Sequence, residues 1–338
     1  MMLRRRTLVC GTMSSLLLPA FARSAASAKH VKKASSPAAT GSYAAFLAGV
    51  RREAIQQGLS ASMLDEALAL TTQPNAKVLK ADRHQPEFTL TWAQYKDRVI
   101  TDKKISDGQN AVAQRTALLS QISQAYGVDR GAIAGIWGLE SAYGTRMGTY
   151  HVVDSLATLA FDGRRSSFFR AELFKALHIL NNGDITPSGM LGSYAGAMGQ
   201  PQFMPSAYER YAASFPAGGR RDIWNNEADV FASIANYLAK CHWQAGEPWG
   251  EQVQVPDTLD QSQIGRAAVH PVSYWAGLGV RPLLGGGFSR PGLEGAVIRP
   301  DGAGGEAYMV YHNFNVIRRY NPSDFYALGV GLLGSAIV

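Results

Sequence analysis

The 338-residue chain has only two cysteines, and Cys10 lies in an N-terminal stretch that we expect to be cleaved off. Cys10 also lacks the small preceding residue of a lipid-attachment signal, so no lipid anchor is expected. Cys241 is then the one cysteine of the mature chain, so neither an internal disulfide nor a cysteine-based zinc site is expected. We expect Cys241 to be a small buried apolar residue.

A hydrophobic run long enough for a permanent membrane span is missing at the N-terminus, because the apolar run Leu8–Leu18 is too short. The run follows three consecutive arginines and precedes small residues, which is the plan of a secretory signal peptide. Residues 1–28 are therefore predicted to be a signal peptide. Residues 29–41, basic and rich in Ser and Ala, are predicted to be a disordered tether.

Charged residues make up only 17% of the chain, and the formal net charge is +7. Removal of residues 1–28 takes away four arginines and no acidic residue, which leaves 29 basic against 26 acidic residues, a net charge of +3. A charge this small gives no reason to expect a nucleic-acid partner.

Helical periodicity covers most of residues 42–127, the predicted N-terminal helical region. Pro74 and Pro86 interrupt the pattern, so residues 72–90 are expected to be irregular. A long helix is expected over about 107–126.

Further along the chain the spacing of apolar residues changes from the helical to the strand pattern, and we expect strands over 251–255, 296–300 and 306–312. The last two are joined by DGAGG, a hairpin turn signal. They predict a small antiparallel β subdomain over 246–312, after which 313–338 returns to the helical core. The sequence therefore predicts an α+β fold that is mainly α.

The most informative stretch is 131–148, GAIAGIWGLESAYGTRMG, for which Asp129 is a suitable helix N-cap. Glu140 lies three residues after Trp137 and four after Ile136, so it shares the apolar face of this helix. Burial of a carboxylate raises its pKa, and a carboxylic acid that stays neutral near pH 7 is what a general acid requires.

Two other interpretations of Glu140 stay open at this point. The helix can be rotated so that the side chain faces solvent, or Glu140 can pair with Arg164 or Arg165. The two arginines themselves suit either a solvated turn or a clamp on an anionic group.

Residues 189–206 contain four glycines and two prolines but few charges, which indicates a backbone that bends closely around a ligand. Ser193, Tyr194, Gln200 and Gln202 supply neutral hydrogen-bonding groups of the kind that bind sugar hydroxyls and amides.

Two helix starts are expected beyond this loop. Ser206–Glu209 has the form of a capping box, and Asn321 with Pro322 at N1 would begin a C-terminal helix.

An aromatic pair lies earlier in the chain. Trp92 and Tyr95, spaced i and i+3, fit either a core or a functional role.

Five stretches, in this order, resemble the lytic murein transglycosylases of the B type over most of residues 42–338: GIWGLESAYGTRMG, DSLATLAFDGRR, GSYAGAMGQPQFMPSAY, ANYLAKCHW and RRYNPSDFYA. The resemblance implies a lysozyme-like helical catalytic core over 128–245, an added N-terminal helical region and a small β subdomain. It also implies cleavage of the β-1,4 bond between N-acetylmuramic acid and N-acetylglucosamine without water, giving a 1,6-anhydro product. Glu140 would be the single catalytic acid/base.

The resemblance also implies a substrate site. Ser193 and Gln202 match the positions that hold the muramic N-acetyl group. The positions that line the saccharide groove are matched by Tyr95, Arg164, Arg165, Tyr237, Tyr320, Asn321 and Tyr326. The implied partners are peptidoglycan glycan strands and enzymes of wall synthesis or recycling, and the implied location is the periplasm.

One stretch departs from the family. Its better-known members carry an acidic calcium loop where this chain has SFPAGGRRDIW, 214–224, with Gly218 and Arg220-Arg221 at the ligand positions. Two arginines repel a divalent cation, so neither a metal nor another cofactor is expected, although Asp222 or Glu227 could support a weaker site.

Two alternative functions use the same residues. A hydrolytic muramidase would combine Glu140 with a positioned water, and a non-catalytic glycan-binding protein would keep the groove without turnover. Ordinary glycosidases need a second carboxylate, and none is evident near Glu140.

Overall fold

The computed structural model describes residues 41–83 and 90–338, so the predicted signal peptide and all of the predicted tether except Gly41 lie outside the described residues. Over this range the chain is mainly helical with two small antiparallel sheets, which confirms the predicted fold class. No described helix is both long enough and apolar enough to cross a membrane.

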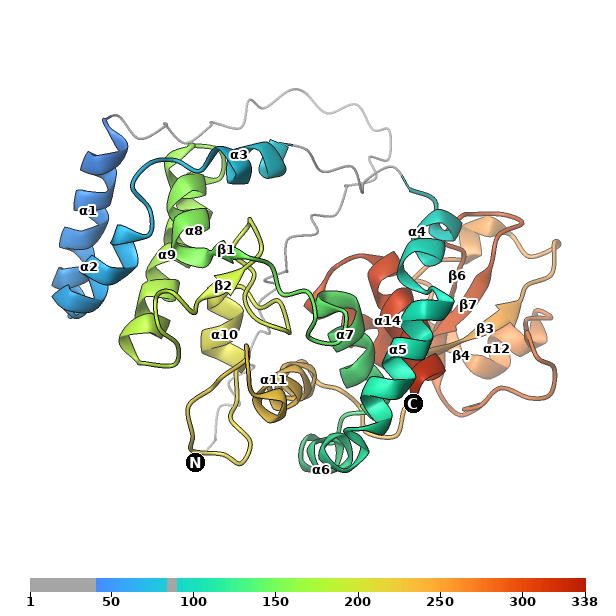
Figure 1. The fold of residues 1–338 in the computed structure, drawn as a ribbon. Coiled ribbons are helices and arrows are strands. Elements are labelled where there is room, and N and C mark those ends of the chain that lie inside the picture. Colours follow the sequence, from blue (N-terminus) through green and yellow to red (C-terminus); the bar gives the residue numbers. More distant parts are fainter. Residues whose placement is uncertain (1–40, 84–89) are drawn as a thin grey trace, which may run out of the picture.

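The helices are α1 (Tyr43–Gln56), α2 (Ala61–Ala69), α3 (Ala76–Arg83), α4 (Trp92–Val99), α5 (Asp102–Ala113), α6 (Thr116–Tyr126), α7 (Arg130–Ser141), α8 (Val152–Phe161), α9 (Ser166–Asn181), α10 (Pro205–Tyr211), α11 (Glu227–Lys240), α12 (Val272–Gly277), α13 (His312–Tyr320) and α14 (Asp324–Ile337). The strands are β1 (Tyr150–His151), β2 (Leu191–Gly192), β3 (Gly250–Gln254), β4 (His270–Pro271), β5 (Arg281–Pro282), β6 (Glu294–Ile298) and β7 (Ala307–Val310). In Figure 1, α7 lies between the helices α1, α2, α8 and α9 at one end and the larger sheet at the other.

The helix α7 begins at Asp129, whose side chain accepts a hydrogen bond from Gly131 N at 2.7 Å. It packs along α14, and small residues bring the two backbones together. A Cβ added to Gly135 would lie 2.4 Å from the Val330 carbonyl oxygen, and one added to Gly334 would lie 2.3 Å from that of Gly131. We call this contact the glycine seam (Gly131, Gly135, Gly334). It fixes α14 against α7.

The larger sheet has five antiparallel strands in the order β4-β6-β7-β3-β5. Its residues alternate between two cores, as the period of a strand requires. Tyr308 and Val310 on β7 face the main helical core, whereas Met309 joins a smaller core around Trp275 of α12. Both faces of the sheet are therefore covered.

The β6–β7 hairpin is fastened to α4. Asp301 in the hairpin turn accepts hydrogen bonds from the backbone N–H groups of Trp92 and Ala93, at 2.5 and 3.0 Å. These groups belong to the first turn of a helix, where backbone donors lack intrahelical partners. Glu306 adds a hydrogen bond from the Trp92 indole at 2.7 Å and an ion pair with Lys96. The hairpin therefore sets the position of α4 (Figure 1).

Two predictions about helices were wrong. The region 72–90 is not irregular throughout, because Asn75 accepts hydrogen bonds from Lys77 N and Val78 N and so starts α3. The helix expected over 107–126 is two helices, α5 and α6. The chain leaves helical geometry at Arg115, whose guanidinium pairs with Glu227 of α11 at 2.6 Å.

Both helices expected beyond the glycine-rich loop are present, but both predicted N-caps were wrong. At α10 the N-cap is Met204, and it is Glu172 of α9, not Glu209, that accepts from Ser206 N at 2.9 Å. At α14 the N-cap is Ser323, which accepts from Tyr326 N. Asn321 instead ends α13, and its side-chain oxygen accepts from Ser323 N at 3.2 Å.

Candidate active site

Glu140 is the second-last residue of α7 and is half-buried, at the end of a helix whose Ile136 and Trp137 are fully buried. Its Oε1 accepts a hydrogen bond from the Tyr326 hydroxyl at 2.6 Å. Tyr326 comes from the first turn of α14, so the glycine seam holds donor and acceptor together. The inward orientation predicted for Glu140 is confirmed, and the rotated helix is excluded.

Desolvation raises the pKa of Glu140 to about 7, from an ordinary value of 4.5. The Tyr326 hydrogen bond and the nearby positive charge of Lys104 act in the opposite direction, because both favour the carboxylate. Glu140 also lies at the carboxyl end of α7, where the negative end of the helix dipole disfavours the charged carboxylate. Glu140 is thus able both to donate and to accept a proton near neutral pH.

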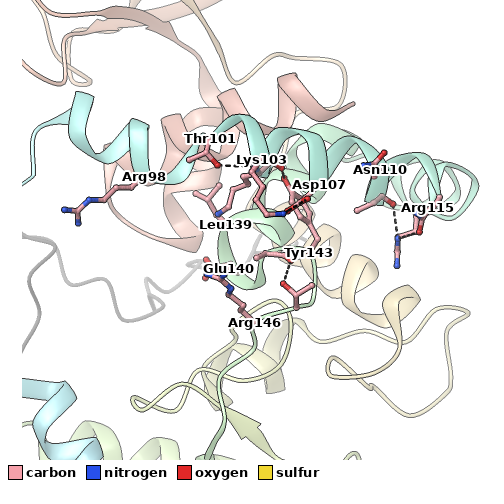
Figure 2. A pocket seen from close by; sticks show the side chains of 15 residues that line it. Arg98, Thr101, Lys103, Asp107, Asn110, Arg115, Leu139, Glu140, Tyr143 and Arg146 are labelled. Carbon is pink, nitrogen blue, oxygen red and sulfur yellow. Dashed lines mark hydrogen bonds and ion pairs between the residues drawn. The ribbon is translucent and has the colours of Figure 1, made fainter.

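Two cavities of about 750 and 260 Å³ meet at Glu140, Leu139 and Arg98. The smaller is also lined by Tyr95 and Tyr326, so the structure brings three of the predicted site residues together. The larger runs along α5 (Figure 2). Of the pair Trp92 and Tyr95, Trp92 belongs to the core and the half-buried Tyr95 faces the cavity.

Among the described residues that line these cavities, Asp107 is the one carboxylate besides Glu140. Both of its oxygens bind the Lys103 amine, at 3.0 and 2.8 Å. Asp107 is therefore engaged in an ion pair, and the described part of the cleft offers no free second carboxylate of the kind that ordinary glycosidases use.

Ser193 and Gln202 in the glycine-rich loop each keep one side-chain hydrogen-bonding group available for a ligand. Ser193 Oγ accepts from Ala195 N and Ala197 N, at 3.3 and 3.0 Å, so its own O–H can donate. Gln202 Nε2 donates to the carbonyls of Met147 and Gly199, at 2.9 and 2.7 Å, so its side-chain oxygen can accept. The Met147 contact ties this loop to the segment that follows α7.

Tyr237, Tyr320 and Asn321 are buried. Tyr237 donates to the Arg319 carbonyl, and Tyr320 donates to the Pro201 carbonyl at 2.6 Å in the glycine-rich loop. The Tyr320 ring also stacks on Tyr326 at 6.4 Å. These residues lie behind the site and connect α13 to the loop and to α14.

Arg164 and Arg165 are separate from the two cavities at Glu140. Both pair with the buried Asp82 on α3, Arg165 at 2.7 Å. The sequence-based alternative that Glu140 pairs with one of them is therefore wrong. Asp82 binds both arginines, which leaves one positive charge in excess, and fastens α3 to the turn between α8 and α9.

Sequence reasoning missed three charged residues. Asp82 lies in a segment expected to be irregular, and Lys104 and Arg146 look like ordinary exposed cations. The structure places Lys104 and Arg146 on the walls of the larger cavity beside Glu140. No spacing rule could have found them, since each comes from a different element.

The carboxylates in and near the loop 214–224 already have partners within the protein. Asp184 pairs with Arg221 at 2.7 Å, Asp222 accepts from Trp224 N and Asn225 N, and Glu227 is held by Arg115. The described residues contain no cluster of three or more His, Cys, Asp or Glu side chains placed to bind a metal. The Arg221 guanidinium also lies 4.9 Å from the Tyr208 ring centre. A side-chain cation therefore provides the positive charge in this loop.

We expect the melting temperature to be unaffected by calcium or by EDTA, whereas Arg221→Ala should lower the free energy of unfolding by about 2 kcal/mol, because it leaves the buried Asp184 unpaired. The matched control is Arg220→Ala, since Arg220 is exposed and makes only a 3.3 Å contact with Asp222. Its effect should stay within about 0.5 kcal/mol. Thermal and urea unfolding measure both. A melting temperature that rises with calcium would contradict this expectation.

Comparisons with known proteins identify the family of the chain. The family model for the transglycosylase SLT domain matches residues 42–335. Membrane-bound lytic murein transglycosylase B of Escherichia coli is 30% identical over 294 residues, which are 83% of this chain and 79% of the relative.

Solved structures are similar as well. SltB3 from Pseudomonas aeruginosa, crystallised with NAG-anhNAM-pentapeptide, is 41% identical and superposes with a TM-score of 0.84 over 88% of this chain and 79% of that chain. Slt35 from Escherichia coli, in a complex with calcium, is 30% identical with a TM-score of 0.72 over 86% of this chain and 92% of that chain. Together these matches confirm the resemblance seen in the sequence and the lysozyme-like fold class. The chain therefore belongs to the SLT-domain family of lytic transglycosylases.

Proposed function

We propose that this protein is a peptidoglycan lytic transglycosylase in which Glu140 is the single acid/base. The observation that carries the proposal is a half-buried carboxyl group with a pKa of about 7, placed where two cavities meet and without a free second carboxylate among the described lining residues. A mechanism that needs one proton-transferring group matches this arrangement, and the relatives named above are lytic transglycosylases.

In the first step Glu140 donates its proton to the oxygen that joins N-acetylmuramic acid to N-acetylglucosamine, and the C1–O bond breaks. Glu140 is then a carboxylate, which the Tyr326 hydroxyl and the charge of Lys104 stabilise. In the second step this carboxylate takes the proton from the C6 hydroxyl of the same muramic residue as that oxygen bonds to C1. The nucleophile is intramolecular, so its effective concentration is high and no water is consumed.

Ser193 and Gln202 are suited to hold the muramic N-acetyl group. The free Ser193 O–H can donate to the acetyl carbonyl, and the free Gln202 oxygen can accept from the amide N–H. We further propose that the saccharide groove is formed or supported by the residues named from the family resemblance: Tyr95, Arg164, Arg165, Tyr237, Tyr320, Asn321 and Tyr326.

We also propose that the signal peptide at 1–28 directs export to the periplasm. The glycan strands are located in that compartment. Enzymes that build or recycle the wall are the proposed protein partners. Cell fractionation tests the first statement, because an exported protein is released with the periplasmic contents.

The product distinguishes the proposed reaction from the alternatives. Purified peptidoglycan is digested in water enriched in oxygen-18, and the fragments are analysed by mass spectrometry. We expect anhydro-muropeptides, which are one water lighter than reducing-end products and contain no label. Labelled reducing ends would instead identify a hydrolytic muramidase, and a complete lack of products would indicate a binding protein.

Replacing Tyr326 with phenylalanine should move the alkaline limb of the kcat/KM profile upward by about one pH unit. The Tyr326 hydroxyl lowers the pKa of Glu140, so its removal lets Glu140 keep its proton to higher pH. The control is Tyr320→Phe, because the Tyr320 hydroxyl donates to the Pro201 carbonyl and not to Glu140. Rates of anhydro-product release between pH 5 and pH 9 provide the measurement. A limb that stays in place or moves to lower pH would rule out this role for Tyr326.

A further inference from the structure

The larger cavity beside Glu140 has a predominantly basic lining. Its charged residues are Arg98, Lys103, Lys104, Asp107, Arg115, Glu140 and Arg146. Two of the cations are neutralised within the protein, Lys103 by Asp107 at 2.8 Å and Arg115 by Glu227 at 2.6 Å. Three cations therefore face two carboxylates that are either already paired or, in the case of Glu140, protonated up to about pH 7.

Lys104 lies near enough to Glu140 for its charge to lower the pKa of that carboxyl group, and Arg146 lies near enough to Lys104 to lower the pKa of its amine. Neither side chain makes an ion pair or a hydrogen bond with any residue in the ranges 41–83 and 90–338. Arg146 nevertheless acts on Lys104. Burial lowers the pKa of Lys104, the nearby Arg146 charge lowers it further, and Glu140 raises it. Two neighbouring like charges that make no ion pair within the described chain repel each other in the empty cavity. Such an arrangement is suited to an anionic ligand.

The backbone holds both residues in fixed positions. Tyr143 follows α7, and its hydroxyl donates to the Lys104 carbonyl at 2.9 Å. Its ring fills the space above Gly108, where an added Cβ would lie 2.3 Å from the phenol oxygen. Arg146 N donates to the Ser141 carbonyl at 2.8 Å, which closes the turn after α7. Lys104 and Arg146 thereby both line the cavity that contains Glu140, and Figure 2 shows Arg146 beside Glu140.

We propose that Lys104 and Arg146 form a subsite for a carboxylate of the peptide stem carried by the muramic residue that Glu140 attacks. This inference rests on the proposed function. The glycan backbone of peptidoglycan is uncharged, whereas its stem peptides bear free carboxylates. Arginine and lysine bind carboxylates through charge-assisted hydrogen bonds. The subsite would make the enzyme prefer strands that still carry their stems.

Arg146 is the better residue to vary, because the charge of Lys104 also lowers the pKa of Glu140. The assay uses soluble glycan strands in three forms: with intact stems, with the stems removed by an amidase, and with the stem carboxylates converted to amides. We expect the wild-type KM to be about tenfold lower for intact stems than for the other two forms. Arg146→Gln should raise the KM for intact stems about tenfold and leave the other two within about twofold.

Lys103→Gln is the matched control. It removes one positive charge from the same cavity wall, but from a side chain that already pairs with Asp107. Its KM values should stay within about twofold of the wild type for all three strands. An equal loss with Arg146→Gln on stem-free strands, or equal wild-type KM values for all three, would overturn the subsite.

The same substrates separate this inference from the proposed function. Anhydro products from stem-free strands support the function, whatever the wild-type preference. If no strand yields a product, the proposed function fails, and calorimetric titration with the intact and stem-free strands still tests the subsite. Tighter binding of intact strands that Arg146→Gln abolishes would support it, and equal binding would refute it.

Discussion

Replacing Glu140 with glutamine should lower kcat by at least about 10³-fold, because glutamine fills the same space but can neither donate nor accept the proton. Release of anhydro-muropeptides measures the effect, and the fold should remain intact. The matched control is Glu66→Gln, which makes the same change on an exposed face of α2 and should leave the rate unaltered. Turnover within tenfold of the wild type would remove Glu140 from the mechanism.

The same variant should also change stability, with an effect that depends on pH. Folding raises the pKa of Glu140 from 4.5 to about 7, so the folded state binds the proton more tightly than the unfolded state does. The stabilisation from this proton is complete below pH 4.5 and is lost as the pH rises through 7. Glu140→Gln has no such loss.

Its free energy of unfolding, compared with that of the wild type, should therefore gain about 3 kcal/mol between pH 4 and pH 8. Urea unfolding at several pH values measures the difference. A difference that does not vary with pH would show that the protonation of Glu140 is not coupled to folding.

Replacing Gly135 with alanine should destabilise the protein by about 3 kcal/mol and lower its melting temperature by about 6–12 °C. The added Cβ would lie 2.4 Å from the Val330 carbonyl oxygen, and backbone atoms cannot rotate away as a side chain can. The helix α14 must then move off α7. Because α14 carries Tyr326, the hydrogen bond to Glu140 should lengthen and the activity should fall as well.

Gly49→Ala is the matched control for this substitution. Gly49 also lies within a helix, α1, but no atom comes within 4 Å of an added Cβ. Alanine is the better helix former, so this variant should be as stable as the wild type or up to about 1 kcal/mol more stable. Equal effects of the two substitutions on thermal unfolding would show that the glycine seam is not tightly packed.

The sequence alone offered the correct orientation of Glu140, the proposed catalytic acid, but did not exclude a rotated helix. The spacing of Ile136, Trp137 and Glu140 on one helix predicted the inward face, and the strand period predicted β6, β7 and their hairpin. These features depend on neighbours within a few residues, where helix and strand geometry fixes which side chains lie together.

The surroundings of that acid could not be predicted in this way. The contact between Glu140 and Tyr326 joins residues 186 positions apart, and the pairing of Asp82 with two arginines joins α3 to a distant turn. The cap predictions failed for a related reason. Glu172 reaches Ser206 N from another helix, so a local capping box is not needed. Tertiary contacts of this kind have no signature in one segment.

Inserting residues into the hairpin turn at Asp301 should have a larger effect than an insertion in most surface turns, because this turn contacts α4. Surface turns generally accept added residues, because little packs against them. Here Asp301 and Glu306 hold the first turn of α4, the helix that presents Tyr95 and Arg98 to the cleft. A lengthened turn would change the width of the groove rather than the stability of the sheet. An insertion in this exposed turn should therefore alter substrate binding in the cleft through the position of α4.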